Sequence, residues 1–488
     1  MEDLFDKLIK YSRSDMYPFH MPGHKRGALT EERTYSIDIT EIDGFDNLHH
    51  PEGIIREINE TATDLYGTAE SRLLINGSTC GILTAISACC SYGGKILVAR
   101  NCHKAVYHGI LLRGLESVYV YPQAESEFGL NGSISPEAVK EALEANQDVQ
   151  AVLVTSPTYD GVLSDIEKIS QIVHTHGLPL IVDEAHGAHL PFSRGFFPES
   201  ALKKGADIVI HSLHKTLPAF TQTAFLHINS QRVDRARIAK YLEVYQTSSP
   251  SYILMAGAGS CLKWLKQEAY AAFKTYEELL LFWRKKYHEL LSGTGKVKLV
   301  EYGEAEDKKF RKVYAYDSSK LIFSIVEGCL NGEELYQIFR ERYHLQMEMA
   351  AYTYVLALSS VCDREEGFKR LYKALEEEFA KKSDNRRKGK EERNFARVES
   401  FWMLPETKQI FTFSEAEKME GKAVNLEASA GFVSASGLYL YPPGIPFLLP
   451  GEEITEEMID YIREIQKTKL KVQGLVNESQ IFVLGRIK

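Results

Sequence analysis

Short apolar segments alternate with helix signals over residues 53–230 of this 488-residue chain. The candidate strands are rich in Val and Ile, as strands buried on both faces should be. They are KILVAR (95–100), SVYVY (117–121), AVLVTS (151–156), PLIVDEA (179–185), DIVIHS (207–212) and AFLHI (224–228). Helix starts at Ser135-Pro136 and Ser164, and a stop at Gly177, lie between them. The alternation predicts right-handed βαβ units and a mostly parallel sheet, with ligands bound beyond the carboxyl ends of its strands.

The length of the chain exceeds what one compact core holds, so we expect two or three domains. A long helix at about 253–290 should bridge the first two domains. We predict an N-terminal arm (1–52), a large domain (53–290), a small α/β domain (291–380), a charged linker (381–394) and a C-terminal α+β domain (395–488).

Composition narrows the class of protein. Hydrophobic content of 44% and charged content of 26% are typical of a soluble globular protein. A net charge of -9 leaves no basic surplus for nucleic acid, so we expect no such partner. Seven cysteines without CxxC spacing, and a start that lacks signal-peptide character, predict a cytoplasmic protein with reduced thiols. No run is long and apolar enough to cross a bilayer, so we expect no membrane partner either.

Two residues at strand ends indicate the chemistry. Asp183 ends the strand in LPLIVDEA, and Lys215 follows the strand in DIVIHSLHK. A lysine amine can form a Schiff base with the aldehyde of pyridoxal phosphate (PLP), and a carboxylate can keep the pyridine nitrogen protonated. A lysine after a strand is more often a surface residue. Here the neighbouring segments favour the cofactor interpretation.

Two segments could hold the phosphate and the ring of this cofactor. Ser78 and Thr79 precede a helix in INGSTCG, where hydroxyls, backbone N–H groups and the helix dipole can bind phosphate. Plain helix capping is the alternative for both. His103 stands where a strand gives way to a helix, and its imidazole could stack on the ring; a capping or core role is the commoner alternative.

The residues around Asp183 and Lys215 complete the predicted site. Ala185 is small enough for the ring to lie against the strand, and His186 could help to hold the cofactor. Ser212 is a candidate phosphate ligand, and His214 could move protons beside the amine. HGAH has no evident thiolate or third ligand, so we expect no metal. DEAH also occurs in helicases, but those need GxxxxGK[ST], and SGTGK (292–296) lacks the first glycine.

With these residues in view, the chain resembles the ornithine/lysine/arginine decarboxylases, in the short bacterial form without an N-terminal wing domain. The segments that carry the resemblance are FHMPGHKRG, DGFDNLHHPEGII, NGSTCG, RNCHKAV, SPTYDGV, VDEAHGAH, HSLHKTLPAFTQTA, QTSSPSY and YPPGIPFLLPGE. Ile210 and Pro218 depart from the family pattern around the lysine. The resemblance implies the aspartate-aminotransferase-like PLP fold of type I.

The resemblance also implies the role of each residue. Lys215 would carry the cofactor, Asp183 would pair with its nitrogen, and His103 would stack on its ring. Ser78, Thr79 and Ser212 would bind phosphate beside His214. Thr158 would lie near the ring hydroxyl. The segment QTSSPSY (246–252), through Thr247 and Ser248, would reach the phosphate of a neighbouring subunit in a homodimer or larger assembly.

The implied function is decarboxylation of arginine, lysine or ornithine to an amine of the polyamine type and CO2. A cationic substrate needs an acidic end to its pocket; the candidates are Asp43, Asp46, Glu348 and Glu427. Which amino acid is the substrate is not readable from them. The alternatives are an aminotransferase or another PLP lyase, a catalytically silent PLP-binding regulator, and a metal hydrolase.

Overall fold

The computed structural model describes residues 3–16, 21–22, 25, 33–125, 127–302, 312–326, 330–380, 404–440, 444–467 and 471–486. The predicted linker at 381–394 and most of the FHMPGHKRG segment lie outside these ranges. No helix within them is long and apolar enough to span a membrane.

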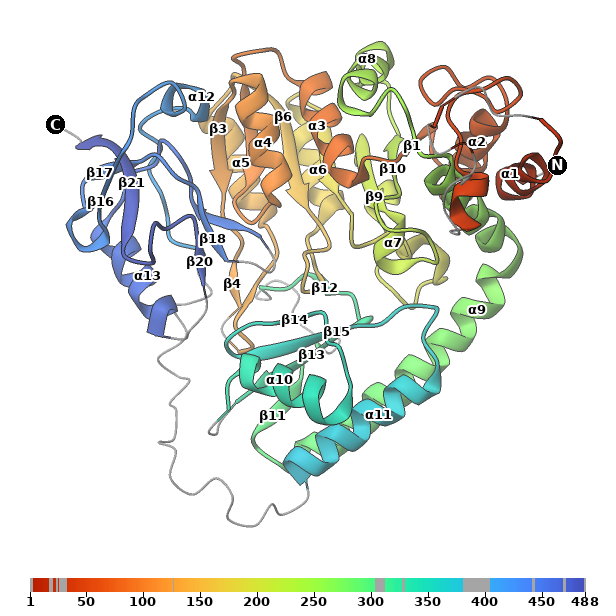
Figure 1. Cartoon of the computed structure of the whole chain (residues 1–488). Helices are drawn as coiled ribbons and strands as arrows, with labels where there is room; N and C mark the ends of the chain where they lie inside the picture. Colours follow the sequence, from red (N-terminus) through yellow and green to blue (C-terminus); the bar gives the residue numbers. More distant parts are fainter. Residues whose placement is uncertain are drawn as a thin grey trace. The chain divides into compact units, whose positions relative to one another are not determined.

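The largest sheet has seven strands in the order β1-β10-β9-β8-β6-β2-β3 (Figure 1). Their bounds are β1 Glu70–Leu74, β2 Lys95–Ala99, β3 Glu116–Val120, β6 Val149–Thr155, β8 Leu180–Asp183, β9 Ile208–Ser212 and β10 Ala224–Ile228. β2 and β3, β6 and β8, and β8 and β9 pair in parallel, whereas β10 runs antiparallel to both β9 and β1. The predicted α/β class with a mostly parallel central sheet is confirmed.

The chain divides into two compact units, and the first comprises residues 1–91, 150–156 and 166–274. Its helices are α1 Leu4–Ser12, α2 Ile54–Tyr66, α3 Gly77–Cys89, α6 Ile166–Thr175, α7 Leu213–Thr216 and α8 Arg235–Tyr245, with short helical turns at Arg33–Ile37, Leu190–Phe192 and Ala201–Lys203. α3 packs closely on the sheet at Gly81, where a β carbon would lie 2.7 Å from Leu74 and 3.3 Å from Ile210. The side chain of Ile210 therefore occupies space that a side chain at position 81 would need.

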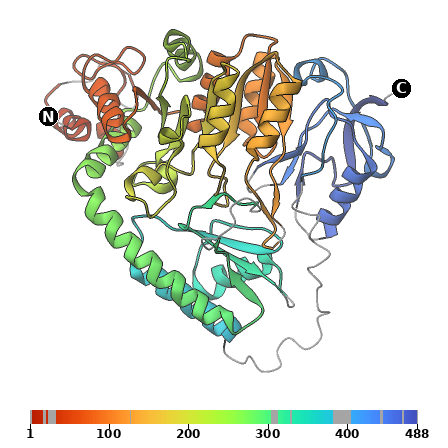
Figure 2. The same ribbon diagram turned by 180° about the vertical axis from the view of Figure 1, so that it is seen from behind.

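The second unit comprises residues 92–149, 157–165 and 275–488. Its helices are α4 Lys104–Arg113, α5 Pro136–Ala145, α10 Gly332–Tyr343, α11 Glu365–Leu375, α12 Phe413–Ala416 and α13 Glu456–Lys467, with short turns at Glu376–Ala380 and Leu426–Ala428. α9 (Tyr252–Ser292) is the long helix expected at 253–290, and its second half lies beside α11 (Figures 1 and 2). There the hydroxyl of Tyr287 donates to the carbonyl of Phe368, at 2.9 Å.

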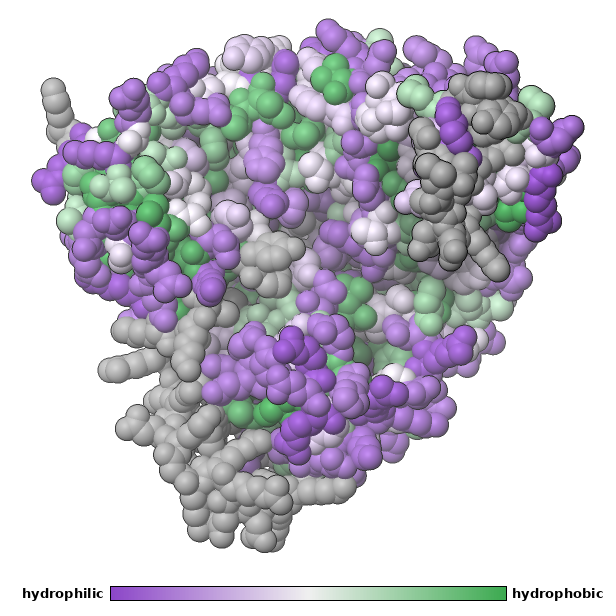
Figure 3. Space-filling view, viewed as in Figure 1, coloured by the Kyte–Doolittle hydropathy of each residue, from purple (hydrophilic) through white to green (hydrophobic). Residues whose placement is uncertain are grey.

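A four-stranded antiparallel sheet in the second unit has the order β11-β13-β15-β14. Its strands are β11 Val297–Leu299, β13 Lys320–Ile325, β14 Met349–Ala350 and β15 Tyr354–Leu358; two small ribbons pair β4 Ala124–Glu125 with β5 Leu130–Asn131, and β7 Val162–Leu163 with β12 Ala315–Tyr316. α10 buries Leu335 and Phe339 and carries hydrophilic residues on the face drawn in Figure 3. This amphipathic pattern is typical of a helix that covers one face of a sheet.

The C-terminal part of the second unit is an antiparallel domain. Its two sheets have the orders β16-β21-β17 and β19-β18-β20. The strands are β16 Lys422–Asn425, β17 Phe432–Ser434, β18 Leu438–Leu440, β19 Pro446–Leu448, β20 Val472–Gln473 and β21 Gln480–Arg486. Leu438, Phe447 and Ile481 from the sheets pack with Ile459 and Ile462 of α13 in one buried cluster.

The starts of α5 and α6 can be compared with the predicted helix starts at Ser135 and Ser164. Ser135 caps α5 as expected, because its side chain accepts the N–H of Ala138 and Pro136 occupies the first turn. The helix expected from Ser164 begins instead at Ile166, and the Ser164 hydroxyl accepts the N–H of Ile134 at 2.9 Å. The Ser164 hydroxyl thus serves as acceptor for a residue 30 positions earlier in the chain.

Asp46 caps α2 from outside the helix. Its Oδ2 accepts the N–H groups of Gly53 (2.9 Å), Ile55 (2.8 Å) and Arg56 (3.3 Å). Its Oδ1 accepts those of Asn47 and Glu52. Burial alone would raise the pKa of this carboxyl, but the backbone donors outweigh burial and lower it.

We predict that Asp46→Ala lowers the free energy of unfolding by about 2 kcal/mol, the upper range for loss of a helix cap. Urea denaturation at pH 7 measures the change. Because the pKa of Asp46 is lowered in the folded state, this contribution should fade as the pH falls below about 4. Asp43→Ala, at an exposed position three residues earlier, should change stability by less than about 0.5 kcal/mol. Equal effects of the two substitutions would contradict the capping role.

Candidate active site

Lys215, Asp183 and His186 lie together in the first unit. The parallel pairing of β8 with β9 places Asp183 opposite Ile210, so the loops after both strands leave the same edge of the sheet. Lys215 lies in α7 directly after β9, and its Nζ is hydrogen-bonded to Nε2 of His186 at 2.9 Å. The predicted grouping of these three residues agrees with this geometry.

Asp183 is a buried carboxyl, 3% exposed. Burial raises its pKa, whereas the charge of Lys215 and the N–H of Ala185, which donates to Oδ1 at 3.1 Å, lower it. Ala185 is itself buried, and its carbonyl accepts the N–H of Ser212 at 3.3 Å. A buried carboxylate needs a cationic or N–H partner, and the ring nitrogen of PLP is such a group.

Ser78 and Ser212 form a hydroxyl pair at the start of α3. Their Oγ atoms are 2.5 Å apart, although 134 residues separate them in the sequence. Gly77 has a φ of 73°, and Asn76, the N-cap, makes no side-chain hydrogen bond to the helix. Thr79 is exposed in the same turn. Two hydroxyls beside a helix start that lacks a side-chain cap fit a phosphate group.

His214, next to Lys215, has a defined tautomer. Its Nδ1 lies 3.0 Å from the carbonyl of Thr223, and a carbonyl only accepts, so Nδ1 carries the proton. Burial, together with the charge of Lys215, lowers the pKa of this imidazole. His214 is therefore neutral near pH 7 and can accept a proton at Nε2.

His103 and Thr158 belong to the second unit, and their positions relative to Lys215 stay predictions. His103 is the N-cap of α4, where its Nδ1 accepts the N–H of Ala105 at 3.2 Å. The capping alternative is thus realised, and it fixes the orientation of the ring. Thr158 is buried in a tight turn, where its Oγ1 accepts the N–H of Val162 at 3.1 Å.

The four acidic substrate candidates differ in their surroundings. Glu348 accepts a hydrogen bond from the hydroxyl of Tyr159, the neighbour of Thr158. Both carboxylate oxygens of Asp46 are engaged by backbone donors, so its interpretation as a substrate ligand is replaced by the capping role. Glu427 is paired with Arg463 in the C-terminal domain, and Asp43 is exposed. Only Glu348 enters the site proposed below.

The segment after α8 lies beside the turn that begins α3 in the same chain. Nε2 of His49 lies 3.0 Å from the carbonyl of Thr247, and the Thr247 N–H points to Oδ1 of Asn76 at 3.5 Å. Ser248 is exposed. Contact with a neighbouring subunit stays a prediction.

Gln222 is a residue of this site that the sequence did not indicate. Its φ of 84° is rare for a residue with a side chain. Its carbonyl accepts the N–H of Gly77 at 3.0 Å, and its Nε2 donates to the carbonyl of Ile75 at 2.6 Å. Gln222 thereby fixes the turn that presents Ser78, and only its place in the TQT segment after the lysine hinted at such a role.

Glu184, next to Asp183, belongs to a buried network on the other face of the sheet. Its Oε2 lies 2.7 Å from Nε2 of His211 and accepts from the hydroxyl of Ser200, while Oε1 accepts the N–H of Ala201 at 2.9 Å. Burial raises the pKa of Glu184 to about 8 and lowers that of His211 to about 3. The pair is therefore neutral near pH 7, and it joins the loop after β8 to β9.

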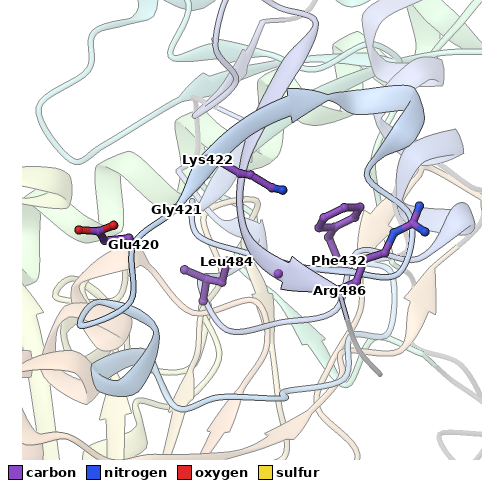
Figure 4. Close-up of a pocket in the computed structure, with 7 residues that line it drawn as sticks. Glu420, Gly421, Lys422, Phe432, Leu484 and Arg486 are labelled. Carbon is purple, nitrogen blue, oxygen red and sulfur yellow. The ribbon is translucent and has the colours of Figure 1, made fainter.

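A pocket in the C-terminal domain lies apart from these residues. A shallow pocket of about 510 Å³ in the C-terminal domain is lined by Lys422 and Arg486 beside the ring of Phe432, and none of the predicted site residues line it (Figure 4). Among the described residues, no group of three or more His, Cys, Asp or Glu side chains could hold a metal ion.

The fold is that of the PLP enzymes of fold type I. The family model for the major domain of Orn/Lys/Arg decarboxylases matches residues 2–280, and the model for their C-terminal domain matches residues 393–482. The chain belongs to the Orn/Lys/Arg decarboxylase family, a PLP-dependent family of carboxy-lyases.

Relatives align over nearly the whole chain. It is 35% identical to the uncharacterized protein YaaO of Bacillus subtilis, with 98% of each chain covered. It is 30% identical to an arginine decarboxylase of the same organism, over 96% of this chain and 95% of the relative. The constitutive lysine decarboxylase of Escherichia coli shares the fold with a TM-score of 0.84 at 18% identity, over 99% of this chain and 81% of that one.

We predict that Glu184→Gln changes how stability depends on pH. Glu184 keeps its proton in the folded state up to about pH 8 but loses it near 4.5 when unfolded. Its stabilising contribution is thus complete below about pH 4.5 and declines as the pH rises towards 8. Urea denaturation of both proteins at pH 5 and pH 8 should show wild type losing stability relative to the variant at the higher pH. An equal difference at both values would mean that the folded-state pKa is not raised.

Proposed function

We propose that this protein decarboxylates a basic amino acid with PLP as cofactor, and that arginine is its substrate. The observation that carries the proposal is the meeting of Lys215 with His186 and the buried Asp183 at the ends of β8 and β9. Arginine is favoured over lysine and ornithine because relatives named arginine decarboxylase, from Bacillus subtilis and Bacillus anthracis, align over 96% of this chain.

In this proposal, Lys215 binds the cofactor aldehyde covalently and Asp183 binds the pyridine nitrogen. When bound, the cofactor supplies an electron sink for the bond that loses CO2. Asp183 stabilises the electron-withdrawing ring by its charge, which acts strongly because the carboxylate is buried. His103 positions the ring from one face, and Ala185 leaves room on the other.

The same contacts support the proposed phosphate and proton-transfer groups. Ser78, Ser212 and Thr79 bind the phosphate at the start of α3, where the helix dipole adds favourable charge. Thr158 binds the ring hydroxyl. His186 holds the amine of Lys215, while the neutral His214 is placed to take or return a proton at Nε2.

The cationic end of the substrate is assigned to Glu348. Its carboxylate accepts from Tyr159, which follows the proposed ring ligand Thr158, so one hydrogen bond within the second unit links the proposed substrate and ring ligands. A homodimer or larger assembly and a cytoplasmic location are part of the proposal, and light scattering of the purified protein tests the first.

We predict that Lys215→Ala slows CO2 release from arginine by more than about 100-fold, the usual contribution of a positioned proton-transfer group. The assay follows CO2 and amine with arginine, lysine and ornithine as separate substrates. Lys203→Ala, an exposed lysine of the same unit, should leave the rate unchanged. Cofactor binding without CO2 from any of the three would favour an aminotransferase or a silent regulator instead.

We predict that Glu348→Gln raises KM for arginine by about 10-fold or more with little change in kcat, because a hydrogen bond to a charged group is lost in both ground and transition states. Steady-state kinetics at pH 7 provide the measurement, and Glu341→Gln, an exposed position on α10, is the matched control. An unchanged KM would remove Glu348 from the substrate site.

A further inference from the structure

Arg100 is a fully buried arginine directly after β2, with 0% of its side chain exposed. Its Nη1 donates to the hydroxyl of Tyr107 at 3.1 Å and to the carbonyl of Pro446, and its Nη2 donates to Oε2 of Glu452 at 3.3 Å. The rings of Tyr107 and Tyr119 lie 5.5 and 5.3 Å from the guanidinium. A buried guanidinium persists only with such a set of partners.

Glu452, the main partner, ends the YPPGIPFLLPGE segment of the C-terminal domain and is 1% exposed. Its Oε1 accepts the hydroxyl of Thr407 at 2.8 Å, and its Oε2 accepts the N–H of Leu449 at 2.7 Å. Gly451 has a φ of 88°, and a β carbon there would lie 2.2 Å from the carbonyl of Phe411. The turn that presents Glu452 therefore requires glycine.

The same arginine holds the turn that leads to His103. The N–H of Arg100 donates to the carbonyl of Val120 at 2.8 Å, and its own carbonyl accepts the hydroxyl of Tyr107 at 2.6 Å. Tyr107 lies on α4, the helix that His103 caps through Ala105. Backbone and side chain of Arg100 thus join the C-terminal domain to both ends of the segment 100–107.

We propose that Glu452, acting through Arg100, is a positioning residue for His103. The C-terminal domain contributes to the reaction without touching the substrate, because it holds the turn from β2 to α4 in the arrangement that His103 needs to stack on the cofactor ring. This inference rests on the proposed function, since the stacking role of His103 is part of that proposal.

Glu452 supplies the negative charge that faces the buried guanidinium of Arg100. If Glu452 is neutralised, the buried guanidinium loses its charge partner while its other contacts stay polar or aromatic, so Arg100 must shift towards another acceptor or water. The turn at residues 100–103 then moves too, because the shifting side chain of Arg100 is attached to the backbone of that turn. The ring of His103 then loses its fixed orientation.

The test uses Glu452→Gln in the full-length protein, with Asp460→Asn as matched control. Asp460 forms an exposed ion pair with Arg463 in the same domain. Hydrogen–deuterium exchange without cofactor should be about 10-fold faster over residues 100–106 in Glu452→Gln, and unchanged in the control. The dissociation constant of PLP should rise, and kcat should fall, by about 10-fold in the first variant only. Unchanged exchange in Glu452→Gln would overturn the inference.

A double-mutant cycle with His103→Ala identifies positioning. If Glu452 acts through His103, Glu452→Gln should add less than about 2-fold to the loss that His103→Ala causes in PLP affinity and kcat. Losses that multiply in the double variant would show an independent effect and contradict the inference.

A third variant separates positioning from folding. Arg100→Met with Glu452→Met replaces the buried ion pair by apolar side chains, which usually preserves stability. It should keep the melting temperature of wild type yet show the faster exchange at 100–106 and the weaker PLP binding. Wild-type exchange at residues 100–106 and wild-type PLP affinity in this variant would mean that the ion pair does not position His103.

The two proposals fail in different ways. A wild-type protein that binds PLP but releases no CO2 from any basic amino acid contradicts the proposed function, while exchange and PLP affinity still judge the role of Glu452. An active wild type with an equally active Glu452→Gln variant overturns the inference alone. A protein that binds no PLP overturns both.

Discussion

The parallel pairing of β8 with β9 is the constraint on which the site depends. It places Asp183 opposite Ile210. Lys215 follows Ile210 by five residues and lies at the same edge of the sheet. A slip of one residue would reverse the face of every side chain on β9 and separate Ser212 from Ser78. Register in the sheet therefore decides whether carboxylate, amine and hydroxyls meet.

The two faces of β9 carry different tasks. Ser212 pairs with Ser78 in the proposed phosphate site, whereas His211 points to the opposite face and meets Glu184, Tyr66 and His227. The rings of His211 and His227 are 4.8 Å apart, and both imidazoles have lowered pKa values because they are buried. The face of β9 that carries His211 is therefore neutral and closely packed. This packing holds the strand rigid while its other face presents Ser212.

Much of the fold was readable because strands buried on both faces leave a continuous apolar signature. β2, β8, β9 and β10 fall within predicted segments, whereas β3 begins one residue and β6 two residues before the predicted starts. β1 (Glu70–Leu74) was missed because its ESRLL sequence mixes charged and apolar residues at the sheet edge, and the antiparallel direction of β10 leaves no mark in composition. The capping role of Asp46 could not be predicted from the sequence, because its five backbone donors come together only in the folded chain.

The residues of the site were predictable to different degrees. Residue type and strand ends sufficed for Lys215, Asp183, Ser78 and Ser212 to be grouped, and the contacts agree with that grouping. Gln222 was not predictable, since its role depends on a positive φ. The link from Glu452 to Arg100 spans 352 residues, and local patterns carry no information on such a distance.

The central claim is that Lys215 carries the cofactor, and one measurement tests it directly. Purified protein is treated with borohydride, which reduces a Schiff base to a stable secondary amine, and its peptides are then identified by mass spectrometry. The account predicts a pyridoxyl-phosphate label on the peptide that contains Lys215, with the modification at that residue. A label on another lysine, or an unlabelled protein saturated with PLP, would contradict it.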